Sequence, residues 1–221
     1  MDIIFFAAVA CYIFFKLHQQ LGKVDEEELK QIRQKIAAKQ SEIVAAQNQI
    51  KTVQPLELKE KNPANEEIIN SLDSSNRANL IEILEKCKID ADFFLKGAKY
   101  AFDLIIKAFS QGDLINLKLL LADKIYQDFE AAINQRKSQE KILITNIIAL
   151  EKAEIVAASL FENNATISVK FISKQINYVV NKEGNIIDGK KDEINQLTDI
   201  WVFKKDLLSS NPNWLVSATN S

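Results

Sequence analysis

Residues that commonly carry out catalysis or bind metals are sparse in this sequence, and they lie far apart. The single histidine, His18, closely follows an apolar N-terminal run, and the two cysteines, Cys11 and Cys87, lie in unrelated surroundings. A catalytic triad or a zinc site needs several such side chains close together, and two cysteines make no disulfide framework. The sequence therefore predicts no catalytic residue, no metal site and no cofactor.

Asp199 is the one carboxylate whose position fits proton transfer. It directly precedes Ile200 and Trp201 in an expected strand, so its side chain could be partly buried. A buried aspartate near a tyrosine hydroxyl carries out proton transfer in some cone-shaped α+β enzymes. Structural carboxylates are far more common than catalytic ones, so we expect Asp199 to be satisfied by backbone amides. The five glycines are scattered and form no phosphate-binding loop.

The charge balance argues against nucleic acid as a direct ligand. The chain has a net charge of −2 at pH 7 and an isoelectric point near 5.6. Proteins that bind nucleic acid directly usually carry a basic patch or stripe. Arginine occurs only at Arg33, Arg77 and Arg136, and no basic tract stands out from the acidic residues.

An uncharged, apolar stretch covers residues 3–15. It is short for a membrane-spanning helix, which usually needs about 17 to 25 residues. Lys16 can place its ammonium at the membrane surface, and Leu17 and Leu21 extend the apolar character. A helix over residues 1–21 would be about 31 Å long, which is enough to span a bilayer. We predict a membrane anchor over residues 1–22, carried by Ile3, Ile4, Phe5, Phe6, Val9, Tyr12, Ile13, Phe14 and Phe15.

Other interpretations of this stretch stay open. A cleaved signal peptide, or a lipoprotein acylated at Cys11, needs a basic start, whereas Asp2 is the only early charge. An interfacial or core helix would show a polar face, and no such face occurs before Lys16. Lys16, His18 and Lys23 follow the stretch, so the positive-inside rule places the rest of the chain in the cytoplasm or, in an organelle, in the matrix. We therefore expect a single-pass membrane protein with its C-terminal domain on that side.

A polar helical linker is predicted for residues 23–89. An apolar stripe with three- and four-residue steps runs through Leu29, Ile32, Ile36, Ile43, Ile50 and Val53. Such a stripe is typical of a short coiled coil, but Lys39 interrupts it, so we expect a solvated spacer with weak self-association at most. Pro55 and Pro63 break the helix, and residues 66–89 predict one or two further short helices within the linker.

A compact domain is predicted for residues 90–221. Asp90 fits the N-cap of a long amphipathic helix and Gly112 fits its end. Gly97 and Ala98 in this helix would let a neighbouring element approach closely. The face expected to be buried comprises Phe94, Ala98, Ala101, Phe102, Ile105 and Phe109. A short helix and a longer one, with Ile125, Phe129 and Ile133 on one stripe, follow it.

After Lys141 the apolar period changes to two, which is typical of strands. The expected strands lie within residues 142–159, 163–189, 198–207 and 213–219. In the second stretch Ile167, Val169 and Phe171 alternate with polar residues, which indicates one buried face. Helices followed by an antiparallel meander predict an α+β domain whose helices cover one face of a curved sheet.

Three stretches of this domain together resemble one known family. They read "FFLKGAKYAFDLIIKAFSQGDLINLKLLL", "YQDFEAAINQR" and "TDIWVFKKDLLSSNPNWLVSAT". The last is the most specific, because a Trp-x-Phe strand precedes Asn-Pro-Asn-Trp at the start of the final strand. These stretches resemble the Tim44-like domain, which occurs in a mitochondrial inner-membrane presequence-translocase subunit and in bacterial inner-membrane relatives.

The resemblance implies a nuclear-transport-factor-two-like cone fold and non-enzymatic adaptor work at an inner membrane, in protein translocation or membrane protein assembly. With the bacterial relatives in view, we expect the inner (cytoplasmic) membrane of a bacterium, with the C-terminal domain in the cytoplasm. The mitochondrial family member recruits a heat-shock-seventy-class chaperone and associates with anionic lipid. The implied partners are therefore membrane lipid and another protein, such as a chaperone or a translocation component. Alternatives are a lipid-binding or small-molecule-binding module, a cone-fold enzyme, and a ribosome–membrane tether. The candidate pocket between helices and sheet would be lined by Phe94, Phe102, Tyr126, Phe129, Trp201, Phe203 and Trp214.

Overall fold

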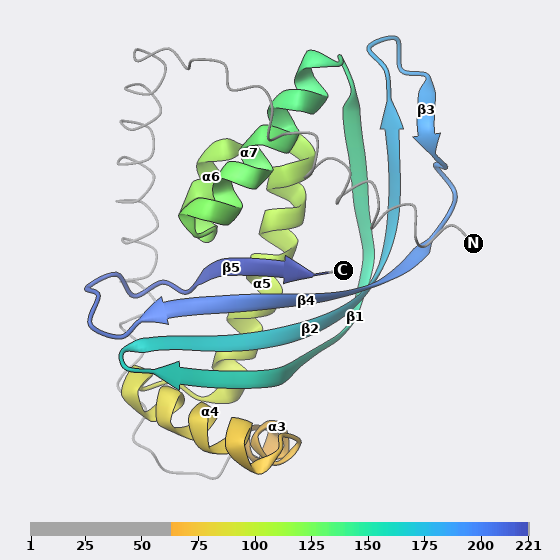
Figure 1. Ribbon diagram of the computed structural model, residues 1–221. Coiled ribbons are helices and arrows are strands. Elements are labelled where there is room, and N and C mark those ends of the chain that lie inside the picture. The colour runs from red at the N-terminus through yellow and green to blue at the C-terminus, as the bar shows by residue number, and fades with distance from the viewer. Residues whose placement is uncertain (1–62, 221) are drawn as a thin grey trace, which may run out of the picture.

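The computed structural model describes residues 63–220, which form an α+β domain with helices packed on a curved antiparallel sheet (Figure 1). The helices are α3 (Pro63–Asn70), α4 (Ser74–Cys87), α5 (Ala91–Gln111), α6 (Leu114–Leu120) and α7 (Asp123–Ser138). The strands are β1 (Ile142–Phe161), β2 (Asn164–Val180), β3 (Ile186–Gly189), β4 (Asn195–Asp206) and β5 (Leu215–Asn220). The predicted α+β class, with helices on a curved antiparallel sheet, is confirmed for these residues, and the arrangement is consistent with a cone-like fold.

Helix α5 begins and ends where the sequence predicted. The Asp90 side chain accepts a hydrogen bond of 2.6 Å from the Phe93 backbone N–H and so caps the first turn. At the other end Gly112 adopts the left-handed conformation, with φ of 70°, which glycine takes at little cost. A Cβ at Gly112 would also lie 3.3 Å from the Ile133 side chain. These two caps fix the length of the helix that covers the sheet.

The sheet has the order β1–β2–β4–β5, and the short β3 pairs with β2 beyond the end of β4. The β1–β2 hairpin is very long, and three register shifts interrupt its ladder, the first between Ile147 and Ala149. Each shift is an irregularity of the bulge type, and bulges bend a strand and increase its twist. They provide a physical reason for the curvature of β1 and β2 toward the helices in Figure 1.

The centre of the core is the inner face of β2, the face turned toward the helices. Ala165, Ile167, Val169 and Phe171 are fully buried on it. The buried face predicted for this strand is therefore confirmed. The matching face of α5 is confirmed as well, since Phe94, Ala98, Phe102 and Ile105 are buried, while Ala101 and Phe109 are half-buried against the core.

Helices α3 and α4 belong to this core, which corrects the predicted linker. Leu80 and Ile83 of α4 are completely buried. Two α4 side chains also bond to the backbone of Ala158 in the edge strand β1. Asn76 accepts from the Ala158 N–H at 2.9 Å, and Asn79 donates to the Ala158 carbonyl at 3.1 Å. Residues on both sides of the predicted domain boundary at residue 90 therefore belong to one hydrophobic core, because α4 buries its apolar side chains against β1.

The predicted anchor over residues 1–22 and the apolar stripe over residues 29–53 lie outside the described residues. Within residues 63–220, no helix is both long and apolar enough to cross a membrane.

Replacing Leu80 with alanine should lower the free energy of unfolding by about 2 to 5 kcal/mol, because the site is buried and the loss leaves a cavity. Ile81 is 38% exposed on the same helix turn, and Ile81→Ala should cost less than about 1 kcal/mol. Urea unfolding followed by circular dichroism measures both values. Equal losses for the two variants would mean that α4 is not part of the core.

Candidate functional site

Four of the seven aromatic residues predicted to line a pocket are core residues. Phe94, Phe102, Trp201 and Phe203 are each at most 5% exposed. The ring centroids of Phe102 and Phe171 are 4.6 Å apart, and those of Phe102 and Trp201 are 4.8 Å apart. These distances are ordinary for packed aromatic rings. The rings therefore contact each other between α5 and the sheet.

The other three predicted aromatics are half-buried at the margins of this core. Trp214 lies 5.1 Å from Phe94, and Phe129 lies 5.0 Å from Phe109, both measured between ring centroids. The Tyr126 hydroxyl donates a 3.0 Å hydrogen bond to Glu130. Burial, followed by this carboxylate, raises the pKa of Tyr126 far above its ordinary value. Tyr126 is therefore a neutral, structural hydrogen-bond donor at physiological pH.

The inner face of β2 changes from apolar to polar at its C-terminal half, a feature that the sequence analysis missed. Ser173 and Gln175 are both buried, and Gln175 donates a 2.8 Å hydrogen bond to Ser173. Asn177 donates to Gln175 at 3.3 Å. In the sequence, the alternation of apolar and polar residues breaks after Phe171, and this break could have indicated the polar half of the strand. The three side chains satisfy each other along one strand, as buried polar groups must.

Asp199 lies on β4, opposite Phe171 of β2, and is half-buried. Because paired residues of antiparallel strands point to the same face, Asp199 shares the inner face with Phe171. The half-burial predicted for Asp199 is confirmed.

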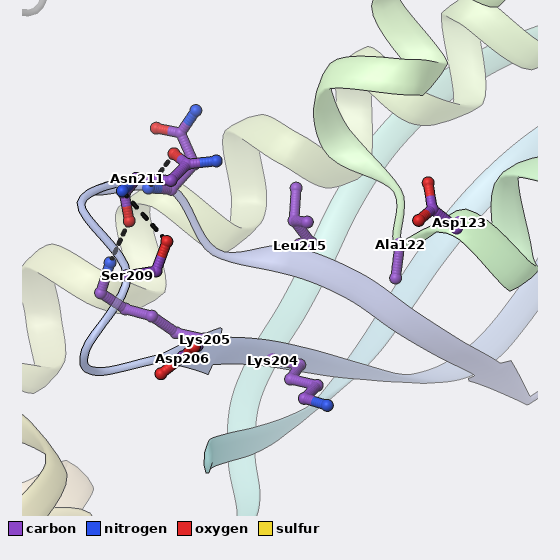
Figure 2. Close-up of a pocket in the computed structure, with 9 residues that line it drawn as sticks. Ala122, Asp123, Lys204, Lys205, Asp206, Ser209, Asn211 and Leu215 are labelled. Atoms are coloured by element: carbon purple, nitrogen blue, oxygen red, sulfur yellow. Dashed lines mark hydrogen bonds between the residues drawn. The ribbon is translucent and has the colours of Figure 1, made fainter. Parts of the chain in front are cut away.

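A pocket of about 270 Å³ opens where the β4–β5 loop meets the start of α7 (Figure 2). Its lining consists of Ala122, Asp123, Lys204, Lys205, Asp206, Ser209, Asn211, Asn213 and Leu215. The Ala122 N–H donates to the Val216 carbonyl at 2.9 Å, which ties α7 to β5 at the pocket wall. The predicted aromatic residues do not line this pocket. The sequence analysis noted its loop only through the Asn-Pro-Asn-Trp motif that precedes the final strand.

Short-range hydrogen bonds shape the pocket loop (Figure 2). Asn211 accepts from the Asn213 N–H at 3.0 Å. The Asp206 carboxylate accepts from the Leu208 N–H at 2.9 Å. Side chains of this kind stabilise turns by bonding to backbone two residues ahead. Lys205 closes the loop by donating to the Asn211 carbonyl at 2.9 Å.

Charges of both signs surround the pocket. Burial lowers the pKa of Lys205, while Cys87 and Asp206 act in the opposite direction. A 2.5 Å ion pair with Lys118 lowers the pKa of Asp123. The lining of the pocket thus carries ammonium, carboxylate and amide groups. Within residues 63–220, no cluster of three or more histidine, cysteine, aspartate or glutamate side chains could hold a metal ion.

Comparison with known proteins decides the family. The family model described as "Tim44-like domain" matches residues 85–221, well over half of the chain. The chain belongs to the Tim44-like domain family. This confirms the resemblance seen in the sequence, and the match begins near the C-terminal end of α4.

The Tim44-like chain is similar, at low sequence identity, to two curated relatives and to one solved structure of another protein. A probable mitochondrial import inner membrane translocase subunit of Caenorhabditis elegans is 24% identical over 109 residues, which are 49% of this chain and 26% of that protein. An uncharacterised protein of Rickettsia prowazekii (strain Madrid E) is 26% identical over 226 residues, which cover 98% of this chain and 95% of that protein. The intermembrane space region of the chloroplast protein ARC6 is 9% identical, with a TM-score of 0.42, covering 57% of this chain and 94% of that structure.

Replacing Lys205 with methionine should change how stability responds to alkaline pH. Burial lowers the pKa of Lys205 below its ordinary value of 10.5, so the unfolded chain holds this proton more tightly. The contribution of Lys205 to the free energy of unfolding therefore increases as the pH rises from its pKa in the folded protein to its pKa in the unfolded chain. Lys205→Met should flatten that rise, whereas Lys204→Met, at an exposed neighbour, should not.

Urea unfolding at a series of pH values, from neutral to about pH 11, measures this effect. Curves of the same shape for both variants would contradict the prediction.

Proposed function

We propose that this protein is a membrane-anchored, non-enzymatic adaptor that acts in protein translocation or membrane protein assembly. The match of the Tim44-like domain over residues 85–221 is the observation that carries the proposal. The Caenorhabditis elegans relative is named as a translocase subunit of an inner membrane, and the full-length relative belongs to a bacterium. These two relatives favour the inner membrane of a bacterium as the place of action.

The packed aromatic core supports recognition through surfaces. Small-molecule sites usually enclose about 300 to 1,000 Å³, and the pocket beside the β4–β5 loop, at about 270 Å³, is smaller. Large apolar side chains are exposed instead, among them Phe161 at 72% and Leu208 at 77%. Aromatic side chains such as phenylalanine are enriched at protein–protein interfaces. An adaptor therefore fits these features better than a small-molecule binder or an enzyme.

The predicted anchor over residues 1–22 gives the adaptor a physical advantage. A partner embedded in the same membrane would meet the tethered domain at a high effective concentration, without additional contacts. The proposed partners are accordingly membrane lipid around the anchor and a membrane-bound protein component of translocation. A chaperone recruited to that component is a further candidate partner.

Two charges placed in the predicted anchor should release the protein from the membrane. Phe6→Arg combined with Ile13→Arg should move the chain from the carbonate-resistant membrane fraction to the soluble fraction, because a charge at the bilayer centre costs about 2.5 to 3.5 kcal/mol. Ile43→Arg combined with Ile50→Arg, in the predicted linker, is the matched control and should leave fractionation unchanged. In intact cells, a cysteine introduced at Ser221 should resist an impermeant thiol reagent. Labelling from outside would reverse the proposed orientation.

A photo-cross-linking amino acid at exposed surface positions should capture a membrane-bound partner. Incorporated at Phe161 in the full chain, it should yield a cross-linked membrane protein at least about tenfold more abundantly than in the Phe6→Arg, Ile13→Arg variant, because tethering raises the effective concentration. Mass spectrometry identifies the product. Asp199→Asn should leave the yield unchanged. If the full chain catalysed a reaction and Asp199→Asn abolished it, the adaptor proposal would be wrong and the protein would be an enzyme.

A further inference from the structure

Helix α5 has a second apolar face that the described residues leave uncovered. Phe93 is 59% exposed and Tyr100 is 67% exposed, although the same helix buries Phe94 and Phe102 on its core side. Phe93, Gly97, Tyr100 and Leu104 follow steps of four, three and four residues, so they form one stripe. The first three of these residues are exposed, and Leu104 is half-buried. This stripe, which we call the outer stripe of α5, lies on the side of the helix opposite Phe102. A helix that is apolar on two opposite faces is typically buried on both.

Gly97 strengthens the case that something packs on the outer stripe. Glycine inside a helix is destabilising relative to alanine, and Gly97 lies in the middle of a 21-residue helix. A Cβ at Gly97 would meet nothing within 4 Å among the described residues, so neither their packing nor a turn requires a glycine there. A glycine between two exposed aromatic rings leaves a notch into which the backbone or a small side chain of another helix can fit.

The chain outside the described residues joins the domain near the N-terminal end of α5, the end that carries Phe93. The Asn65 side chain, in the first turn of α3, accepts a 2.7 Å hydrogen bond from the Ala91 N–H at the start of α5. Phe93 is two residues further along. The chain that precedes Pro63 therefore enters beside the N-terminal end of α5. Residues 54–62 can reach at most about 30 Å when extended, and α5 itself is about 31 Å long.

We propose that residues 43–53 form a helix that packs on the outer stripe of α5. In this segment Ile43, Ala46, Ile50 and Val53 fall on one helical face, with a small residue between two large ones. The outer stripe has the same order, with Gly97 between Phe93 and Tyr100. Facing helices interlock when a large residue on one meets a small residue on the other. The docking does not depend on the adaptor function.

The size of the outer stripe favours this segment over a separate partner. A stable interface between two proteins usually involves about 20 to 30 residues on each side, and the stripe offers four. A segment tethered through residues 54–62 experiences an effective concentration in the millimolar range, at which a small contact suffices. Docking would hold the predicted anchor close to α5, so the domain would stay near the membrane surface instead of moving on a free spacer.

Photo-cross-linking within the full chain tests the docking. With p-benzoylphenylalanine at Tyr100, irradiation of the detergent-solubilised protein should give a product of monomer mass whose cross-linked peptide lies in residues 43–53. Ile43→Asp combined with Ile50→Asp should reduce this product at least about fivefold, because a charge buried in an apolar contact is costly. Asn48→Asp combined with Thr52→Asp adds the same charge on the opposite face and should change the yield less than about twofold.

Two further variants keep the test independent of folding. Gly97→Leu fills the notch but has room in the described domain, so the circular dichroism spectrum should be unchanged while the cross-link is lost. The photo-cross-linker at Leu208, in the β4–β5 loop, should not reach residues 43–53. A Tyr100 product of dimer mass, a product with lipid or another protein, or no product with residues 43–53 would overturn the proposal.

Discussion

The ring contacts between α5 and the inner face of the sheet hold this domain together. Phe102 lies against both Phe171 of β2 and Trp201 of β4, and all three side chains are at most 3% exposed. Truncating a buried aromatic residue typically costs about 3 to 5 kcal/mol. This contact sets the position of the long helix, and α5 in turn contacts α3, α6 and β1. The arrangement of the helical layer thus depends on these rings.

The long edge of β1 is the second constraint on the fold. An exposed edge strand is prone to pair with other chains, and proteins usually interrupt or cover it. Here side chains from the helices bond to β1 backbone near both ends. Ser110 of α5 donates to the Leu143 carbonyl at 2.9 Å, and the α4 asparagines bond to Ala158. The register shifts in β1 bend the strand between these points. Helix α4 therefore protects the edge as well as filling the core.

The distribution of apolar groups explains why we place function on surfaces. Aromatic side chains predicted to line a cavity instead contact each other inside, whereas Phe93 and Tyr100 point outward from α5. The pocket beside the β4–β5 loop carries charges of both signs and a loop fixed by its own hydrogen bonds. The adaptor function proposed above would use surfaces of this kind, and the predicted anchor would keep them near a common membrane.

The sequence alone determined the local elements. Asp90 and Gly112 marked the ends of α5 because capping depends on a few neighbouring backbone groups, and the alternation through Ile167, Val169 and Phe171 gave the buried face of β2. Only the tertiary structure decided which elements share a core. The weak periodicity of α4 predicted a linker helix. In the structure its Leu80 and Ile83 are buried, and the helix packs against β1, a strand some seventy residues further along the chain. The inward Ser173 and Gln175, and the pocket formed where the β4–β5 loop meets α7, were also beyond local patterns. They depend on contacts between residues distant in sequence, and no local propensity encodes those contacts.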